Sequence, residues 1–177
     1  MSYQAIGIIV GLILGGLITA LILKMANTNN MVKTEYDERQ QLIRGKAYKI
    51  AFWTLSGGLI CVSIADMAFP NMHITNYIVL TALFFVALSV MCLYCIINGC
   101  YWGLNNNKKT YMIIFWIAGL LNLFNSVMAI IGGYMVVNGE LQFPFIGLMC
   151  TLFIAIVAGT ALICDGRDKN DSDESED

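Results

Sequence analysis

The stretch that decides the fold runs from Tyr77 to Ile97 and reads YIVLTALFFVALSVMCLYCII. None of its residues is charged. A helix rises about 1.5 Å per residue, so about 20 apolar residues cross the hydrocarbon core of a bilayer, which is about 30 Å thick. The stretch therefore predicts a membrane-spanning helix.

Four other blocks have similar length and apolar character, and they cover about 4–23, 48–69, 111–135 and 143–164. Irregular backbone cannot face lipid, so each block should be helical throughout. Of the 177 residues, 58% are hydrophobic and only 12% are charged, whereas a soluble domain carries about 25% charged residues. The sequence predicts an all-α integral membrane helical bundle with about five transmembrane helices.

All ten basic residues fall on one side of the membrane if the chain has five spans. They are Lys24, Lys33, Arg39, Arg44, Lys46, Lys49, Lys108, Lys109, Arg167 and Lys169. The connections on the other side, 71–76 and 137–142, contain none. Cytoplasmic loops carry the excess of Lys and Arg, so we expect the N-terminus outside and the C-terminus in the cytosol. No base precedes the first block, which favours an uncleaved anchor in the cell membrane over a signal peptide.

These boundaries divide the chain into six parts. They are an N-terminal transmembrane helix (1–25), a basic, amphipathic cytosolic loop (26–47), a first transmembrane hairpin (48–98), a cytosolic loop (99–110), a second hairpin (111–164) and a disordered acidic cytosolic tail (165–177). The second and fourth blocks both begin Tyr-x-Ile-x-Phe-Trp, at Tyr48 and Tyr111. This likeness indicates either a duplicated hairpin or aromatic side chains at the membrane interface.

The fourth block carries a polar face near its middle, formed by Asn122, Asn125 and Ser126. Polar groups in a membrane need partners, so this face either bonds to another helix or lines a watered cavity for a small polar substrate. Asp66 is the only acid inside a predicted span. Its position near the outer end of the span favours a hydrated carboxylate over a proton-coupling one.

Gly7, Gly11 and Gly15 recur every four residues on one face of the first block. Such spacing lets helix backbones approach closely. The alternatives are a homo-oligomer contact and packing against the chain's own helices, and the second is favoured because four partner helices are present.

The loop before the second block is the most informative polar segment. Thr34 followed by Asp37 resembles a capping box, and Glu35 with Arg39 forms an i,i+4 pair of opposite charge. We expect a short helix along the cytosolic membrane surface that leads into the second span. The segment is either an orientation signal only or a docking surface for a cytosolic partner, and the candidate docking residues are Asp37, Glu38, Arg39, Arg44 and Lys46.

The run YDERQ at 36–40, with RGKA at 44–47 before a span, resembles a pattern in small uncharacterised multi-pass membrane proteins of Gram-positive anaerobes. Some such proteins are encoded beside small helix-turn-helix regulators. The resemblance therefore implies a role in membrane-linked signalling, and it implies no catalytic residue.

Two functional hypotheses remain. The first is a non-enzymatic multi-pass membrane protein, a regulatory or accessory factor that docks a cytosolic partner through residues 34–46. The second is a small transporter or channel subunit with a polar site on the Asn122/Asn125/Ser126 face. An enzyme would need converging acids, His or a nucleophile pair, and the loops offer none. We expect the lipid bilayer as surroundings and no cofactor, metal or nucleic-acid partner.

Overall fold

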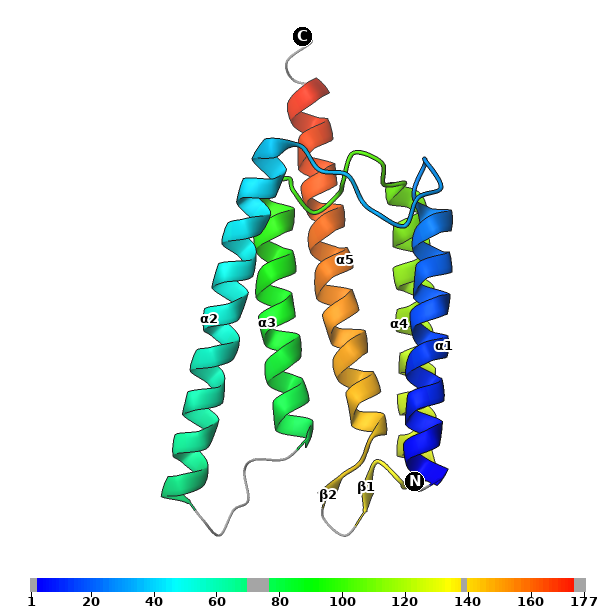
Figure 1. Ribbon diagram of the computed structural model, residues 1–177, viewed down its shortest axis with the longest axis vertical. Helices are drawn as coiled ribbons and strands as arrows, with labels where there is room; N and C mark the ends of the chain where they lie inside the picture. Colours follow the sequence, from blue (N-terminus) through cyan, green and yellow to red (C-terminus); the bar gives the residue numbers. More distant parts are fainter. Residues whose placement is uncertain (1–2, 70–76, 138–139, 174–177) are drawn as a thin grey trace.

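Five long helices run side by side in the computed structural model of the chain (Figure 1), which describes residues 3–69, 77–137 and 140–173. The helices are α1 (Tyr3–Ala26), α2 (Glu38–Ala68), α3 (Tyr77–Ile97), α4 (Lys108–Ile131) and α5 (Pro144–Asp173). Two short antiparallel strands, β1 (Val136–Val137) and β2 (Glu140–Leu141), lie between α4 and α5. All five helices are long and apolar enough to cross a membrane. The predicted all-α membrane bundle is therefore confirmed.

The helices pack as two hairpins that meet through their second members. Helix α2 packs on α3, α4 packs on α5, and α3 packs on α5. Near one end, Cys92 and Ile96 of α3 form a buried cluster with Val157 and Ala161 of α5. Most other large apolar side chains are exposed, as lipid-facing side chains of a membrane protein should be.

Helix α2 begins at a capping box. The Asp37 carboxylate accepts the Gln40 N–H at 2.6 Å, and the Gln40 side-chain oxygen accepts the Asp37 N–H at 3.3 Å. From there the helix continues to Ala68 without a break. Residues 38–47, expected as a short helix leading into the second span, are therefore the first turns of α2 itself, because no Pro interrupts the following turns. The predicted capping box at Thr34 is wrong, because the box is set at Asp37.

Two predicted helix ends also differ from the structure. Helix α4 ends at Ile131 instead of near 135, because the chain turns at Gly132 and Gly133, and Gly133 has a left-handed φ of 73°. Helix α5 continues through Asp173, so residues 165–173 are helical where we expected disorder. The rest of the predicted disordered tail, 174–177, lies outside the described residues.

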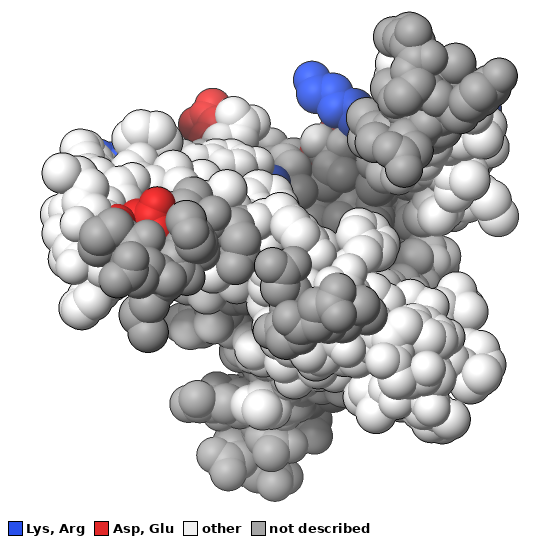
Figure 2. Space-filling view, turned by 90° about the horizontal axis from the view of Figure 1, so that it is seen from below, with Lys and Arg blue, Asp and Glu red and all other residues white. Residues whose placement is uncertain are grey.

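All ten basic residues belong to segments at one end of the bundle, where α1, α3 and α5 finish and α2 and α4 begin (Figure 1). We call this end, which holds residues 24–49, 98–109 and 164–169, the basic end. Seen from the opposite end, most of the described surface carries neither basic nor acidic side chains (Figure 2). The basic end is therefore the place where charged groups gather. That it faces the cytosol stays a prediction.

Candidate functional site

The two loops of the basic end are joined by backbone hydrogen bonds. The N–H of Thr28, just after α1, donates to the carbonyl oxygen of Asn105 at 2.8 Å. The N–H of Leu104 donates to the carbonyl oxygen of Glu35, also at 2.8 Å. Loop 27–37 and loop 98–107 therefore form one ordered unit over the end of the bundle.

The side chain of Asn105 strengthens this unit. It is buried, with 5% of its surface exposed, and all its bonds go to the other loop. Its oxygen accepts the N–H of Glu35 at 2.9 Å. Its nitrogen donates to the side-chain oxygen of Asn29 and to the carbonyl oxygen of Lys33, both at 3.0 Å. Asn105 therefore fixes the path of the loop that leads into α2.

A second buried asparagine ties α1 to α4. The side-chain oxygen of Asn27 accepts the hydroxyl of Tyr111 at 3.0 Å, and its nitrogen donates to the carbonyl oxygen of Met31 at 2.7 Å. The sequence hypotheses missed both asparagines. The available signal was two asparagine-rich runs, 27–30 and 105–107, one in each loop of the same side.

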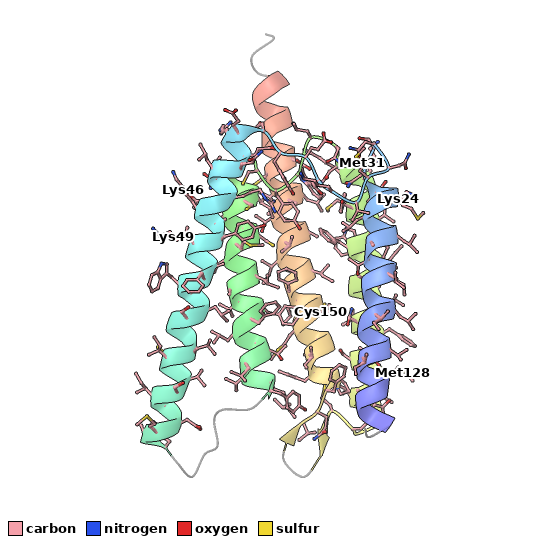
Figure 3. All side chains as sticks on the ribbon, in the orientation of Figure 1. Lys24, Met31, Lys46, Lys49, Met128 and Cys150 are labelled. Carbon is pink, nitrogen blue, oxygen red and sulfur yellow. The ribbon has the colours of Figure 1, made fainter. Side chains whose placement is uncertain are left out.

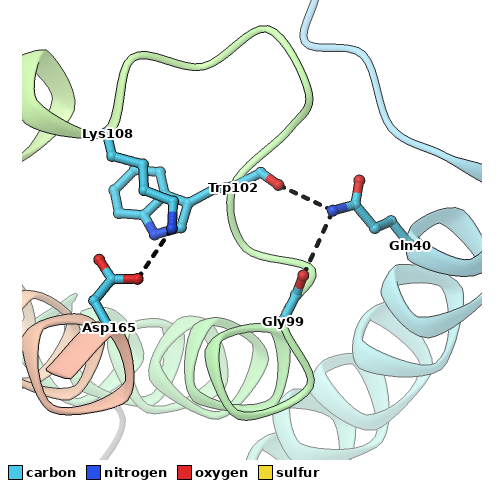
Figure 4. Close-up of polar contacts among 5 residues, drawn as sticks. All are labelled: Gln40, Gly99, Trp102, Lys108 and Asp165. Carbon is cyan, nitrogen blue, oxygen red and sulfur yellow. Dashed lines mark hydrogen bonds and ion pairs between the residues drawn. The ribbon is translucent and has the colours of Figure 1, made fainter. Parts of the chain in front are cut away.

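The predicted docking segment sits on this ordered unit. The side-chain nitrogen of Gln40 donates to the carbonyl oxygens of Trp102 at 3.2 Å and Gly99 at 3.5 Å (Figure 4). The first turn of α2 is thereby attached to the loop that follows α3. Four of the five candidate docking residues of this segment are exposed; these are Asp37, Glu38, Arg39 and Lys46.

The fifth candidate, Arg44, is only half-exposed and lies differently. Its guanidinium carbon lies 4.1 Å from the centre of the Tyr36 ring, and one guanidinium nitrogen donates to the Tyr48 hydroxyl at 3.0 Å. Burial raises the pKa of the Tyr36 hydroxyl, and the positive charge of Arg44 opposes this shift. Arg44 and Tyr36 both line a cavity of about 260 Å³.

A second cavity of about 230 Å³ lies at the same end, between loop 98–107 and α5. Lys108 and Asp165 lie on its lining, and the Lys108 nitrogen is 3.0 Å from an Asp165 carboxylate oxygen (Figure 4). The two side chains are 54% and 37% exposed. Ion pairs with this much exposure stabilise a protein by at most about 1 kcal/mol. The first residue of the acidic tail thus contacts a basic segment of the same chain.

The polar face predicted in α4 is only partly assembled. Ser126 is fully buried, and its hydroxyl lies 2.9 Å from the carbonyl oxygen of Asn122 and 3.1 Å from that of Pro144 at the start of α5. The Asn122 amide donates to the carbonyl oxygen of Ala118 at 2.9 Å. Asn125 is exposed. The structure therefore places Asn122 and Ser126 at the α4–α5 contact and Asn125 outside it.

Asp66 and the glycines of α1 lie away from these groups. Asp66 is half-buried in the last turn of α2, at the end of the bundle opposite the basic end. An added Cβ at Gly11 or Gly15 would meet no atom of the described chain within 4 Å. The expectation that these glycines pack against the chain's own helices is therefore wrong at these two positions, and the burial of Gly7 lies outside what the structure describes. A contact with a second copy stays a prediction.

The described residues contain no group of three or more His, Cys, Asp or Glu side chains arranged to hold a metal ion. The six cysteines form no disulfide.

Comparison of the chain with protein-family models, curated proteins and solved structures finds no match. The resemblance of segments 36–40 and 44–47 to proteins of Gram-positive anaerobes therefore stays a prediction.

Proposed function

We propose that this chain is a non-enzymatic multi-pass membrane protein, a regulatory or accessory factor that docks a cytosolic protein partner through residues 34–46. The observation that carries the proposal is the attachment of Gln40 to the carbonyl oxygens of Gly99 and Trp102. This attachment fixes the first turn of α2 while Glu38 and Arg39 stay exposed. A partner that binds a fixed turn does not have to order it first, which lowers the entropic cost of binding.

The charge pattern supports a protein as the partner. A membrane surface attracts bases alone, because its lipids carry negative charge. Residues 37–39 instead place two acids beside one base on the same exposed turn. Adjacent charges of both signs suit a protein surface with the complementary arrangement, since such complementarity favours one partner over others.

Site-specific photo-crosslinking in the organism that encodes the chain tests this proposal. A photoreactive residue at position 39 should give an adduct of one discrete mass with a soluble protein. The same residue at position 49, further along α2 and exposed, should not give that adduct. The double change Glu38→Arg with Arg39→Glu keeps the net charge and reverses the pattern. A photoreactive residue at position 41, which is exposed and outside the capping box, should give the adduct without the double change and lose it with the double change. Identical adducts at 39 and 49, or an adduct that survives the double change, would count against docking.

We further propose that the basic end faces the cytosol. The proposal rests on the location of all ten bases at that end. In a variant without native cysteines, a membrane-impermeant thiol reagent applied from outside should label a cysteine at position 140 and leave one at position 38 unlabelled. The opposite pattern would reverse the orientation.

The transporter or channel hypothesis stays a prediction. Its predicted site includes both Asn125 and Ser126, but Asn125 is exposed on the surface of α4 whereas Ser126 is buried. No specific contact in the described chain favours this function over docking.

A further inference from the structure

We propose that the cavity beside Arg44 binds a small organic anion that has an apolar body and one hydrogen-bond donor. The cavity lies at the basic end between α1, α2, α3 and α4, and its volume is about 260 Å³. The residues that decide its chemistry are Tyr36, Arg44, Tyr101, Trp102, Asn106 and Phe115.

The charge of the cavity comes from Arg44. Lys108 and Asp165 form the one ion pair within the described part of the chain, so Arg44 has no acidic partner there. A guanidinium carries five N–H donors, and the bond to the Tyr48 hydroxyl uses one. Removing a charge from water without a counter-charge is costly. The half-buried guanidinium therefore favours an anion, and its planar fork suits a carboxylate or a phosphate oxygen pair.

Lysines of the same helix show that this placement is specific to Arg44. Lys46 and Lys49 project outward from α2, away from the other helices (Figure 3). Both are exposed and neither lines the cavity. The helix thus directs one base inward, beside the ring of Tyr36, and the next two outward.

Aromatic rings provide the apolar part of the cavity. The rings of Tyr101 and Trp102 meet edge to face with their centres 4.9 Å apart, and the rings of Trp102 and Tyr111 lie 5.9 Å apart. Rings fixed against one another present rigid faces at little entropic cost. Such faces suit a planar apolar body on the ligand.

Asn106 adds a requirement for a donor. Its side-chain oxygen is buried and has no hydrogen-bond partner. Asn106 belongs to the cavity lining, and nearly all buried polar atoms in proteins are bonded. A rotation of this amide toward the cavity would let a ligand donate to its oxygen. A hydroxyl or N–H on the apolar body fulfils this requirement.

The volume limits the size of the ligand. Ligand sites for drug-sized molecules start at about 300 Å³, so this cavity suits one ring with a short acidic chain. A phospholipid would place only its headgroup phosphate inside. Arg44 would bind an anionic oxygen group in either case, whether it belongs to a soluble organic anion or to a lipid headgroup. The experiment must therefore separate these two ligands.

The probe is 4-hydroxyphenylacetate, added to the full chain in nanodiscs of uncharged phosphatidylcholine. Trp53 and Trp116 are both exposed and are replaced by Phe, which leaves Trp102 as the fluorescent reporter on the cavity lining. We expect saturable binding. Arg44→Gln should weaken the affinity by about tenfold or more, which is the effect of losing a hydrogen bond to a charged group. Lys49→Gln removes the same charge from the exposed side of α2 and should leave the affinity unchanged.

Two measurements on ligands make the test independent of how Arg44→Gln folds. The uncharged 4-hydroxyphenylacetamide should bind to the unaltered cavity about tenfold more weakly or worse. Phenylacetate, which lacks the hydroxyl, should bind about fivefold more weakly, and Asn106→Leu should remove that difference. Nanodiscs containing phosphatidylglycerol provide the lipid arm. Competitive loss of probe binding in them would assign the site to a lipid phosphate, and unchanged binding would assign it to a soluble anion.

The proposal is overturned if the probe does not saturate, if the amide binds as tightly as the acid, or if Arg44→Gln and Lys49→Gln have the same effect.

Discussion

The two buried asparagines of the basic end, Asn27 and Asn105, and the polar side chains inside α4 differ in how far along the chain their hydrogen bonds reach. All three bonds of the Asn105 side chain reach residues 70 to 76 positions earlier in the chain. The Asn122 side chain bonds to a carbonyl four positions earlier in its own helix. Ser126 lies between these cases, because it is within reach of both its own helix and the first residue of α5.

This difference separates two uses of a polar group in a membrane protein. A bond inside one helix satisfies the side chain but leaves the position of that helix relative to others free. A bond between distant segments fixes their relative position. The basic end therefore has the polar contacts that can hold a binding surface, and four substitutions test how far the contrast extends.

Asn105→Ala should have the largest effect. It leaves the Glu35 N–H and the Lys33 carbonyl oxygen without the partner that Asn105 provides, and unsatisfied groups cost about 1–3 kcal/mol each when buried. The Asn29 side-chain oxygen loses one donor and keeps the Met31 N–H. Because loop groups can recover water, we expect a total loss of about 3 kcal/mol in the free energy of unfolding. Thermal unfolding in detergent measures it.

The matched control for Asn105 is Asn98→Ala. Asn98 is a half-buried asparagine of the same end, and its side chain donates only to the Tyr94 carbonyl four positions earlier. Its loss should cost less than about 1 kcal/mol. Equal losses for the two variants would break the contrast between distant and local bonds.

Tyr111→Phe should have the next largest effect. The change removes the hydroxyl that donates to the buried Asn27 oxygen and leaves that oxygen without this donor. We expect a loss of about 1–2 kcal/mol, which a shift in Tm reports. Tyr134→Phe, at an exposed tyrosine, should leave Tm unchanged. No shift for Tyr111→Phe would show that Asn27 does not join α1 to α4.

Ser126→Ala should have a smaller effect. Bonds between transmembrane helices contribute about 0.6 kcal/mol on average, and this hydroxyl also has an acceptor in its own helix. The variant should therefore lower the free energy of unfolding by about that amount. A loss above about 2 kcal/mol would place Ser126 with the asparagines of the basic end.

Lys108→Gln should have the smallest effect. The pair with Asp165 is exposed, so its removal should cost about 0.3 kcal/mol or less at low salt. Screening should reduce the difference further at about 1 M salt, where the Debye length is about 3 Å. A cost that does not change with salt would indicate a buried pair.

Much of the fold could be predicted because apolar length is a strong signal. The predicted third span, Tyr77–Ile97, coincides with α3. The boundaries were less accurate where local chemistry decides them. The start of α2 depends on which residue forms the capping box, and the end of α4 depends on a left-handed Gly133.

The site was harder to predict, because its contacts join residues far apart in sequence. Arg44 and Lys46 look alike as bases before a span, and only the packing of α2 places Arg44 beside the Tyr36 ring. The role of Asn105 likewise depends on a loop that lies more than seventy positions away. The asparagine-rich runs at 27–30 and 105–107 indicated polar loops on the same side, but composition and periodicity do not show which residues of the two loops pair.

Amide hydrogen exchange in the unaltered protein tests most directly the central claim that the two loops of the basic end form one ordered unit. The N–H groups of Thr28, Glu35 and Leu104 donate across the two loops, at 2.8 to 2.9 Å. We predict that these amides exchange slowly and that all three lose protection together in Asn105→Ala. Exchange at the rate of an unstructured loop in the unaltered protein would contradict the account.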